Sequence, residues 1–454
     1  MDNETRRALG AWYTPAPIVE HVLDQTLEPV LASRRSADGL RVLDPACGDG
    51  AFLVAAGRRI RERFGIDPRP CLFGIDVDPV AATVAAQHAT VVEGDGLVAD
   101  LGAPFDVVVG NPPFLGQLRR RTARAEAKGD GYADTAALFL DRAITLARPD
   151  GGRIGLVLPQ SLLAARDAHK IRCRALERSA FRSLWFAPEM MFDDASVHVV
   201  VATFERGGRA MPVTRTYGAA FTATGSIEPP LIGPWSTLVA DLVGVPAVEV
   251  KTRRVLGDIA AATADFRDQY YGLIGAVSDD GDGPPLVTSG LIDVGHSAWG
   301  DRPARFAKSA YRAPRVTLDR LSPDLRQWAT RRLVPKVLVA TQTPVIEAVV
   351  DARGAWLPSV PVITVTGADP WSIAAVLSSP VASAWLAART LGTGLSPAVL
   401  RPTARLLMSL PLPDRPWDVA TLFLRDGDVL SAAHAMGDAY GTHDADAWWR
   451  ARVR

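Results

Sequence analysis

The sequence predicts an α/β protein with a doubly wound, Rossmann-like sheet, followed by a second domain of mixed α+β type. Strand-like apolar runs alternate with helix-like stretches from residue 40 to about residue 204, and a glycine-rich turn directly follows the first run. This βα rhythm stops beyond residue 212, where Pro, Trp and Thr become more frequent. We therefore expect domains at residues 1–210 and 211–454, divided where glycines and a proline end the last strand.

The expected elements of the first domain follow one another as strands and helices. Residues 40–44 and 71–76 are strands that end in Asp44 and Asp76, and residues 51–64 between them have apolar side chains at helical spacing. The remaining expected elements are a helix opened by Asp78 and Pro79, strands at 91–92 and 105–110, a helix at 135–147, a strand at 152–158, a helix at 160–178, and closing strands at 184–187 and 197–204.

The composition excludes several classes of protein. With 48% hydrophobic and 22% charged residues the chain is globular, and its 50 basic and 50 acidic residues provide no overall positive field that would attract nucleic acid. Cys47, Cys71 and Cys173 form no CxxC pair, and the seven histidines contain no HxxxH or HExxH arrangement, so we expect neither disulfides nor a metal. The charged amino terminus and the lack of a run of about 18 apolar residues predict a cytoplasmic protein without a membrane segment.

A glycine-rich turn after the first strand is the first candidate binding feature. Gly48 and Gly50 allow the backbone to approach a ligand closely, because glycine has no Cβ and tolerates positive φ. Asp44 and Asp76 end neighbouring strands in a doubly wound sheet, so a carboxylate at this edge can accept from both hydroxyls of a ribose. The pattern is shorter than GxGxxG, which favours a nucleoside-type ligand over a dinucleotide. Taken alone, the turn is equally compatible with a purely structural role.

The tetrapeptide Asn111-Pro112-Pro113-Phe114 follows the expected strand at 105–110 and lies at the same edge. The two prolines restrict the backbone, so the Asn111 amide and the Pro112 carbonyl can be held pointing into one small volume. Two acceptors beside an aromatic ring suit an exocyclic amine on a flat ring, which Phe114 would stack upon. An ordinary turn at the end of a strand is the alternative interpretation.

Together these motifs resemble a known family, the N6-adenine DNA methyltransferases of restriction–modification systems. The similarity covers residues 11–206 and is greatest to the gamma class, in which the cofactor motif precedes the catalytic one. The matching segments are Trp12 to Pro15, Leu43 to Gly50, Gly74 to Asp78, Gly94 to Gly96, and Asn111 to Phe114. The resemblance implies a class I methyltransferase catalytic domain with S-adenosylmethionine as cofactor, followed by a domain that recognises the DNA target. The sequence departs from the family pattern at Asp49, where the family more often has Ser. This substitution affects the expected hydrogen bonds of the loop but not its expected shape.

The resemblance also implies roles for individual residues. It assigns cofactor contacts to Tyr13, Thr14, Asp44, Ala46, Gly48, Gly50, Asp76, Val77, Asp95 and Pro113. It assigns catalysis to Asn111, Pro112 and Phe114, and stacking on the flipped target base to Phe114 and Phe192. For Phe192, packing in the core is an equally good interpretation.

The implied reaction is direct methyl transfer to adenine N6 in double-stranded DNA, without a metal or a covalent intermediate. A separate cognate endonuclease is a further partner that such systems can include. NPPF-type sites also occur in enzymes that methylate adenine in RNA or glutamine in proteins, and a DNA-binding module with an inactive site is a third alternative. Neither the recognised sequence, nor the base-reading residues, nor the oligomeric state can be derived from the sequence.

Two basic segments are candidates for contact with DNA phosphates. Arg119, Arg120 and Arg121 lie in a long stretch after the catalytic turn, where a phosphate clamp and a solvated loop are alternative interpretations. Residues 301–340 hold ten basic and three acidic residues together with Phe306, Tyr311 and Trp328, and Arg315 and Arg332 are the DNA-binding candidates chosen from this window. A solvated face is the alternative there too.

Overall fold

The computed structural model describes residues 14–100, 102, 104–114, 134–191, 198–265, 267–394 and 399–453. The chain divides into two compact units, Met1–Val239 and Ala240–Arg454. Tyr13, Arg119, Arg120, Arg121 and Phe192 lie outside the described residues.

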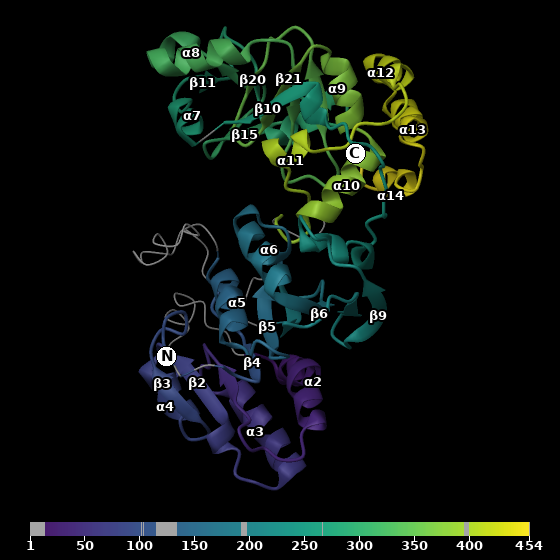
Figure 1. Ribbon diagram of the computed structural model, residues 1–454. Helices are drawn as coiled ribbons and strands as arrows, with labels where there is room; N and C mark the ends of the chain where they lie inside the picture. The colour runs from purple at the N-terminus through teal and green to yellow at the C-terminus, as the bar shows by residue number, and fades with distance from the viewer. Residues whose placement is uncertain are drawn as a thin grey trace. The chain divides into compact units, whose positions relative to one another are not determined.

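The amino-terminal unit is built on a nine-stranded sheet in the order β3-β2-β1-β4-β5-β7-β6-β8-β9 (Figure 1). Strands β3 to β5 of this order are parallel, whereas β7 runs antiparallel to both β5 and β6. The strands are β1 (Val42–Asp44), β2 (Leu72–Asp76), β3 (Thr90–Glu93), β4 (Val107–Gly110), β5 (Arg153–Pro159), β6 (Ser179–Phe186), β7 (Val199–Arg206), β8 (Val213–Tyr217) and β9 (Thr222–Ile227). The predicted doubly wound sheet is therefore confirmed.

Helices cover both faces of this sheet. They are α2 (Ala16–Ser33), α3 (Ala51–Phe64), α4 (Pro79–Ala85), α5 (Thr135–Leu146) and α6 (His169–Arg178). Helices α2 and α3 pack on each other and share one hydrophobic core with the inner strands, while α5 and α6 form a second packed pair (Figure 1). Helix α4 begins as predicted, because the Asp78 side chain accepts from the Val80 backbone N–H at 2.9 Å and Pro79 occupies the first turn.

The helix expected at 160–178 is wrong in its first half. Two 3₁₀ turns, Gln160–Leu163 and Arg166–Ala168, precede α6. Side chains hold these turns in place: Gln160 donates to the Ala187 carbonyl at 2.8 Å, and buried Arg172 donates to the carbonyls of Leu162 and Ala165 at 2.7 and 2.9 Å. Tertiary hydrogen bonds thus replace the helical ones that the apolar spacing predicts.

The domain boundary expected at residue 210 is also wrong. Strand β8 pairs in parallel with β6, and β9 pairs with β8, so the sheet of the first unit continues past that point. Beyond β9, Trp235 is fully buried against Phe181 and Phe204, with ring centroids 4.8 and 5.7 Å apart. Residues 211–239 therefore complete the first core, and the second unit begins at Ala240.

The carboxy-terminal unit is of mixed α+β type, as predicted. Its main sheet has the order β10-β21-β18-β19 with antiparallel pairing throughout. The main strands are β10 (Ala260–Ala264), β18 (Lys336–Val339), β19 (Ala348–Asp351) and β21 (Ile363–Gly367). Short strands pair elsewhere in the unit: β11 (Val277–Ser278) with β17 (Arg315–Val316), β12 (Leu286–Val287) with β20 (Leu357–Pro358), β13 (Ile292–Asp293) with β14 (His296–Ser297), and β15 (Ala304–Phe306) with β16 (Ser309–Tyr311).

The helices of this unit are α7 (Arg267–Gly272), α8 (Pro323–Arg332), α9 (Pro370–Leu377), α10 (Pro380–Thr390), α11 (Ala404–Met408), α12 (Asp418–Arg425), α13 (Val429–Tyr440) and α14 (Asp446–Arg450). Helices α9 to α13 contribute to one hydrophobic core with the four-stranded sheet. Among the described residues no single helix has the length and apolarity to span a membrane, although α9 and α10 together, bent by 59°, reach these values.

Candidate functional site

The predicted site residues of the amino-terminal unit meet at one edge of its sheet. Asp44 ends β1, Asp76 ends β2 and Asn111 directly follows β4, and these three strands are neighbours in the sheet. The register pairs Asp44 with Gly74 on one side and Leu43 with Val108 on the other, so the carboxyl ends of the strands coincide. Because ligands of open α/β sheets bind at this edge, the arrangement matches the sequence prediction.

The glycine turn is held against β2 by backbone hydrogen bonds. Gly48 and Gly50 have φ of +55° and +95°, conformations that favour glycine. The Gly48 N–H donates to Asp76 Oδ2 at 2.7 Å, and the Cys47 N–H donates to the Ile75 carbonyl at 2.9 Å. Burial raises the pKa of the Cys47 thiol, and the nearby carboxylates raise it further, so this cysteine is poorly suited to act as a nucleophile.

Asp44 links the glycine turn to the turn that contains Asn111. Its side chain is buried, and its Oδ1 accepts from the Ala46 N–H at 3.0 Å. A Cβ added at Gly110 would lie 2.6 Å from the same Oδ1. Only glycine leaves room for this carboxylate beside β4, so the two motifs are in direct contact.

Burial raises the pKa of Asp44 to about 8, against the opposing effect of the Ala46 hydrogen bond and with a smaller contribution from the charge of Asp76. An Asp in an unfolded chain loses its proton near pH 4, so between about pH 4 and 8 the folded protein binds more protons than the unfolded one. The free energy of unfolding should therefore fall as the pH rises through this range, by at most about 1.4 kcal/mol per pH unit from this group.

Replacing Asp44 with Asn should remove this part of the pH dependence, because the amide keeps an acceptor for Ala46 and cannot ionise. Urea unfolding of both proteins at pH 5, 6, 7 and 8 measures the effect. Asp49→Asn is the matched control, since Asp49 lies in the same turn but is exposed. Parallel pH profiles for Asp44→Asn and the unmodified protein would contradict the explanation.

The Asn111 turn is in contact with the segment before α2. The Asn111 Nδ2 donates to Thr14 Oγ1 at 3.0 Å, and Thr14 is buried. Pro112 is buried, whereas Pro113 and Phe114 are half-buried, and Phe114 packs against the core that α2 and α3 share with the sheet. The hydrogen bond to Thr14 determines which end of the Asn111 amide is the acceptor.

The two carboxylates beyond β2 and β3 line the same edge. The Asp76 side chain accepts from the Asp78 N–H at 2.9 Å as well as from the Gly48 N–H. It therefore holds both the backbone that follows β2 and the glycine turn that follows β1. Asp95 accepts from the Leu97 N–H at 2.9 Å. A Cβ at Gly96 would collide with the Pro45 carbonyl, so this segment lies directly against the glycine turn. Of the remaining predicted cofactor residues, Ala46 is half-buried and Val77 is 57% exposed.

Comparison with known proteins decides the family. Residues 2–217 match the model of the N-6 DNA methylase family. This part of the chain belongs to the N-6 DNA methylase family. The resemblance drawn from the sequence motifs is confirmed, as is the class I methyltransferase fold, which implies the use of S-adenosylmethionine.

Two methyltransferases of known restriction–modification systems are similar in sequence to the methylase unit. The chain is 29% identical over 231 residues to the type II methyltransferase M.TthHB8I of Thermus thermophilus, covering 48% of this chain and 50% of that protein. It is 34% identical over 214 residues to the methylase subunit of the type I restriction enzyme MjaIX of Methanocaldococcus jannaschii, covering 42% of this chain and 36% of the relative. The chain thus spans half or less of the length of these relatives.

A solved restriction–modification enzyme matches both units of the chain. It is the type IIL restriction-modification enzyme MmeI in complex with DNA, with a TM-score of 0.66 and 16% identity, covering all of this chain and 79% of that one. At this identity the match describes the fold alone.

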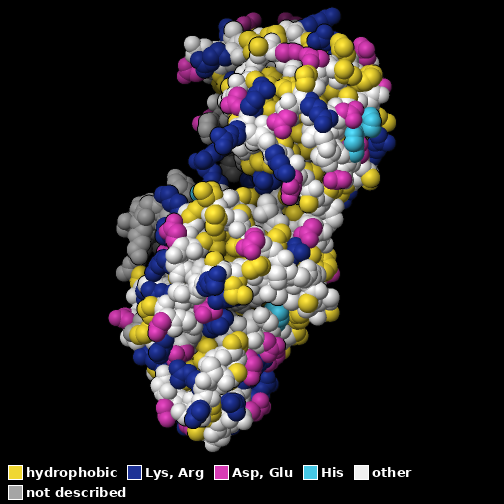
Figure 2. Space-filling model, turned by 45° about the vertical axis from the view of Figure 1, so that its right-hand side comes forward, with side chains coloured by type: hydrophobic (Ala, Val, Ile, Leu, Met, Phe, Trp, Pro, Cys, Tyr) yellow, Lys and Arg dark blue, Asp and Glu magenta, His cyan; other side chains and the backbone are white. Residues whose placement is uncertain are grey.

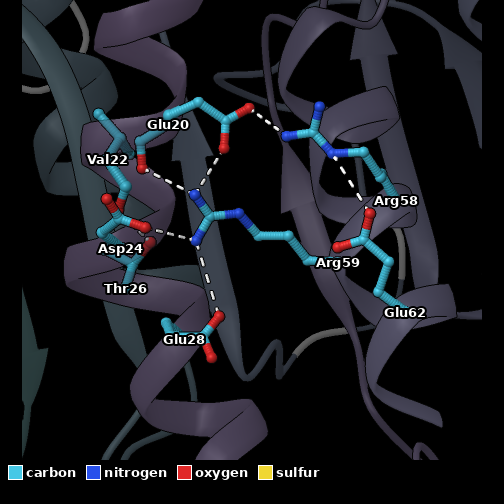
Figure 3. Close-up of polar contacts among 8 residues, drawn as sticks. All are labelled: Glu20, Val22, Asp24, Thr26, Glu28, Arg58, Arg59 and Glu62. Carbon is cyan, nitrogen blue, oxygen red and sulfur yellow. Dashed lines mark hydrogen bonds and ion pairs between the residues drawn. The ribbon is translucent and has the colours of Figure 1, made fainter.

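An ion-pair cluster attaches α2 to α3 (Figure 3). Arg59 on α3 is 13% exposed and contacts three acidic side chains of α2: Glu20 at 2.6 Å, Asp24 at 2.7 Å and Glu28 at 3.7 Å. Burial favours a higher pKa for Glu20, but its hydrogen bonds to Arg59 and Arg58 lower that pKa below its usual range. Because Thr14 lies two residues before the start of α2, this cluster also positions the hydrogen-bond partner of Asn111.

Arg59→Gln should lower the free energy of unfolding by about 1–3 kcal/mol, because hydrogen bonds to charged groups in partly buried sites contribute about this much. Arg58→Gln is the matched control, since Arg58 contacts Glu20 and Glu62 but is 55% exposed, and its loss should cost under about 1 kcal/mol. Urea unfolding measures both variants. Equal losses would show that the buried position of Arg59 is unimportant.

The two predicted DNA-binding arginines of the second unit have intramolecular partners. Arg332 forms a two-point contact with Asp265, and Arg315 donates to the Gly283 carbonyl at 3.0 Å while its guanidinium lies 4.8 Å from the centre of the Trp299 ring. Carboxylates outside residues 301–340 also pair with Arg302 and Lys336. Three of the seven excess positive charges of that window are therefore compensated by Asp265, Asp293 and Asp351.

Sequence reasoning missed two residues and one contact that shape the site. The roles of Arg59 and Gly110 and the hydrogen bond between Thr14 and Asn111 were not recognised. A glycine directly before the Asn-Pro-Pro turn is a signal that could have been used, because glycine in a strand often marks a close approach of another group.

Proposed function

We propose that the protein is a site-specific DNA adenine N6-methyltransferase that uses S-adenosylmethionine and acts in a restriction–modification or related defence system. The observation that carries the proposal is the direct contact between the two motifs: Asp44 of the cofactor turn lies against Gly110, the residue before Asn111. A methyl donor bound at the glycine turn would therefore be close to an amine held by Asn111.

The residues at the sheet edge fit a nucleoside-type cofactor. Two glycines with positive φ expose the backbone of the turn, and Asp76 and Asp95 place carboxylates beyond two adjacent strands, where ribose hydroxyls and an adenine amine need acceptors. Thr14, Ala46, Val77 and Pro113, together with Tyr13, complete the proposed contacts. When bound, S-adenosylmethionine supplies an activated methyl group on a sulfonium.

The chain's own residues orient and activate the amine. We assign the Asn111 amide oxygen and the Pro112 carbonyl as acceptors for the two hydrogens of adenine N6, and Phe114 as the stacking surface for the ring. Two acceptors favour the pyramidal nitrogen that attacks, and their fixed positions reduce the cost of orientation. The hydrogen bond from Asn111 to Thr14 keeps the amide in this orientation.

Duplex DNA is the favoured substrate because the relatives from Thermus thermophilus and Methanocaldococcus jannaschii are a type II methyltransferase and the methylase subunit of a type I restriction enzyme, and the fold match to MmeI includes both units. A base within a duplex cannot reach the Asn111 turn, so the adenine must be flipped out at a cost of a few kcal/mol. Stacking on Phe114, and on Phe192 by our sequence prediction, would offset this cost. We place the protein in the cytoplasm, with a separate endonuclease as a partner to be tested.

Transfer of tritium from labelled S-adenosylmethionine to duplex DNA, RNA and protein, measured side by side, tests the substrate class. We expect label in duplex DNA. Label in RNA alone or in a glutamine-containing protein alone would replace the proposal by one of those activities, and no transfer to any of them would leave a binding protein.

The basic side chains of residues 301–340 are the proposed DNA-facing surface, in which Arg315 and Arg332 are half-buried and Arg305 is exposed. Arg315→Ala and Arg332→Ala should each weaken DNA binding and reduce the slope of log K against log salt by about one, as expected for a lost phosphate contact. Arg332→Ala also removes the partner of Asp265, so its stability must be measured in parallel. Arg305→Ala is the comparison without this complication, because Arg305 is exposed. An unchanged slope in all three variants excludes this surface.

A further inference from the structure

A cluster of two histidines and two aspartates lies on the carboxy-terminal unit, far in sequence from the methylase motifs. His434 and Asp438 are four residues apart on α13, which places them on the same face of the helix. Helix α13 ends at Tyr440 and is capped by Gly441 with φ of +76°, and the chain then turns back and brings His443 alongside the His434 ring. Figure 2 shows histidine and acidic side chains together on the surface of this unit.

The arrangement of the rings is specific. The two imidazoles are stacked with their centroids 4.5 Å apart and their planes inclined by 26°. The Nδ1 atoms of both rings face one carboxylate oxygen of Asp446, which lies 2.9 Å from His443 and 3.8 Å from His434. On the other edge, Nε2 of His443 lies 3.1 Å from Asp438 Oδ1. One ligand atom each from His434, Asp438 and His443 lies within 4.8 Å of the other two.

We propose that His434, Asp438 and His443 form a binding site for a divalent transition metal of the zinc type. Two imidazole nitrogens and one carboxylate are a ligand set that Zn²⁺ binds with a further position open to water. Asp446 then accepts from Nδ1 of His443, which leaves Nε2 as the ligand atom. A carboxylate that orients a ligating histidine in this way is the usual outer partner in zinc sites.

Two features of the surroundings support a built site. A Cβ at Gly437 would collide with the His443 ring, so this glycine in the middle of α13 allows the ring to lie against the helix. A hollow of about 480 Å³ reaches His434 and Asp438, so an ion can enter and retain water ligands. Two cations lie nearby: Arg450 lines this hollow, and Arg415 donates to the Asp438 backbone carbonyl at 3.1 Å. Among the described residues, neither of these arginines forms an ion pair with the Asp438 carboxylate.

The sequence prediction of no metal relied on HxxxH and HExxH patterns, which this cluster does not contain. Here the spacing is His-x₃-Asp-x₄-His, and the third ligand comes from the chain after the helix end. The bound ion would join α13 to the turn before α14. It takes no part in the proposed methyl transfer, so the two proposals can fail independently.

Isothermal titration of the chelator-treated full chain with Zn²⁺ alone tests the site. Cys173 and His169 on α6 approach to 3.8 Å and are a competing pair, so the Cys173→Ser protein is the reference. We expect one zinc ion per chain with a dissociation constant of roughly micromolar order, and a loss of affinity of about tenfold or more in His434→Ala and in His443→Ala. Asp446→Asn should weaken binding by about 10–100-fold without removing a ligand.

His296→Ala is the matched control, because His296 is an exposed histidine of the same unit outside the cluster, and it should leave zinc binding unchanged. Co²⁺ provides a second readout: its visible absorption should indicate nitrogen and oxygen ligands in the reference protein and disappear in His434→Ala. The three ligands are exposed, so the variants should fold, which circular dichroism checks. The proposal would be overturned if no binding were detected at Zn²⁺ concentrations about 100-fold above the expected dissociation constant. It would also be overturned if His434→Ala and His443→Ala left zinc binding intact.

Discussion

Asn111→Ala should abolish methyl transfer while leaving cofactor binding intact. The substitution removes the amide that donates to Thr14 and, under the proposed mechanism, one of the two acceptors for the attacking amine. Removing one prearranged hydrogen-bonding group of this kind commonly costs about 10²–10³-fold in rate, and here the orientation of the amine is lost as well. Single-turnover assays with labelled S-adenosylmethionine measure the rate.

Cofactor binding, followed by calorimetry, separates this effect from damage to the site. The glycine turn and Asp44 are held by Ala46, Asp76 and Ile75 rather than by the Asn111 side chain, so the affinity for S-adenosylmethionine should change by less than about threefold. Turnover in Asn111→Ala within a factor of about ten of the unmodified rate would remove Asn111 from its proposed role.

Gly110→Ala should have the second large effect, because it acts on both motifs at once. Its new methyl group would lie 2.6 Å from Asp44 Oδ1, well inside contact distance, so either the buried carboxylate or the Asn111 turn must move. We expect lower cofactor affinity together with a loss of methyl transfer of about 10²-fold, since displacements of about 1 Å in a catalytic site can cost this much. A lower free energy of unfolding, by about 1–3 kcal/mol, should accompany these changes.

Gly290→Ala is the control for the substitution itself. Gly290 has no heavy atom within 4 Å of an added Cβ and no left-handed backbone, so the methyl group meets open space. Its stability and activity should match those of the unmodified protein. If Gly110→Ala behaves like Gly290→Ala, the contact between Asp44 and β4 does not join the two motifs.

The parts of the fold that were predictable from the sequence depend on local signals. Strands β1, β2 and β4 are short apolar runs followed by a turn or a polar residue, and α4 begins with an aspartate cap and a proline. Helix α2 was not predicted, because Pro15 and Pro17 flank its start and Pro29 lies inside it. Strands β8 and β9 were missed because β8 joins the sheet by pairing with β6, which is not its neighbour in sequence, and β9 is placed only by its pairing with β8.

The candidate site likewise has features that were predictable from the sequence and features that were not. That Asp44, Asp76 and Asn111 share one edge follows from the rule that parallel strands end together, so their convergence could be predicted. The contacts that hold them could not, because they join residues distant in sequence: Thr14 with Asn111, and Gly110 with Asp44. The basic window was overestimated for this reason too, since Asp265, which pairs with Arg332, lies 67 positions away.

The identity of the methylated nucleoside tests the central claim most directly. Duplex DNA that has been incubated with the protein and labelled S-adenosylmethionine is digested to nucleosides, and the labelled product is identified by chromatography and mass spectrometry. The Asn111 turn and the adjacent cofactor edge predict label in N6-methyladenine, lost in Asn111→Ala. Label confined to a methylated cytosine, or N6-methyladenine formed equally by Asn111→Ala, would contradict the proposal.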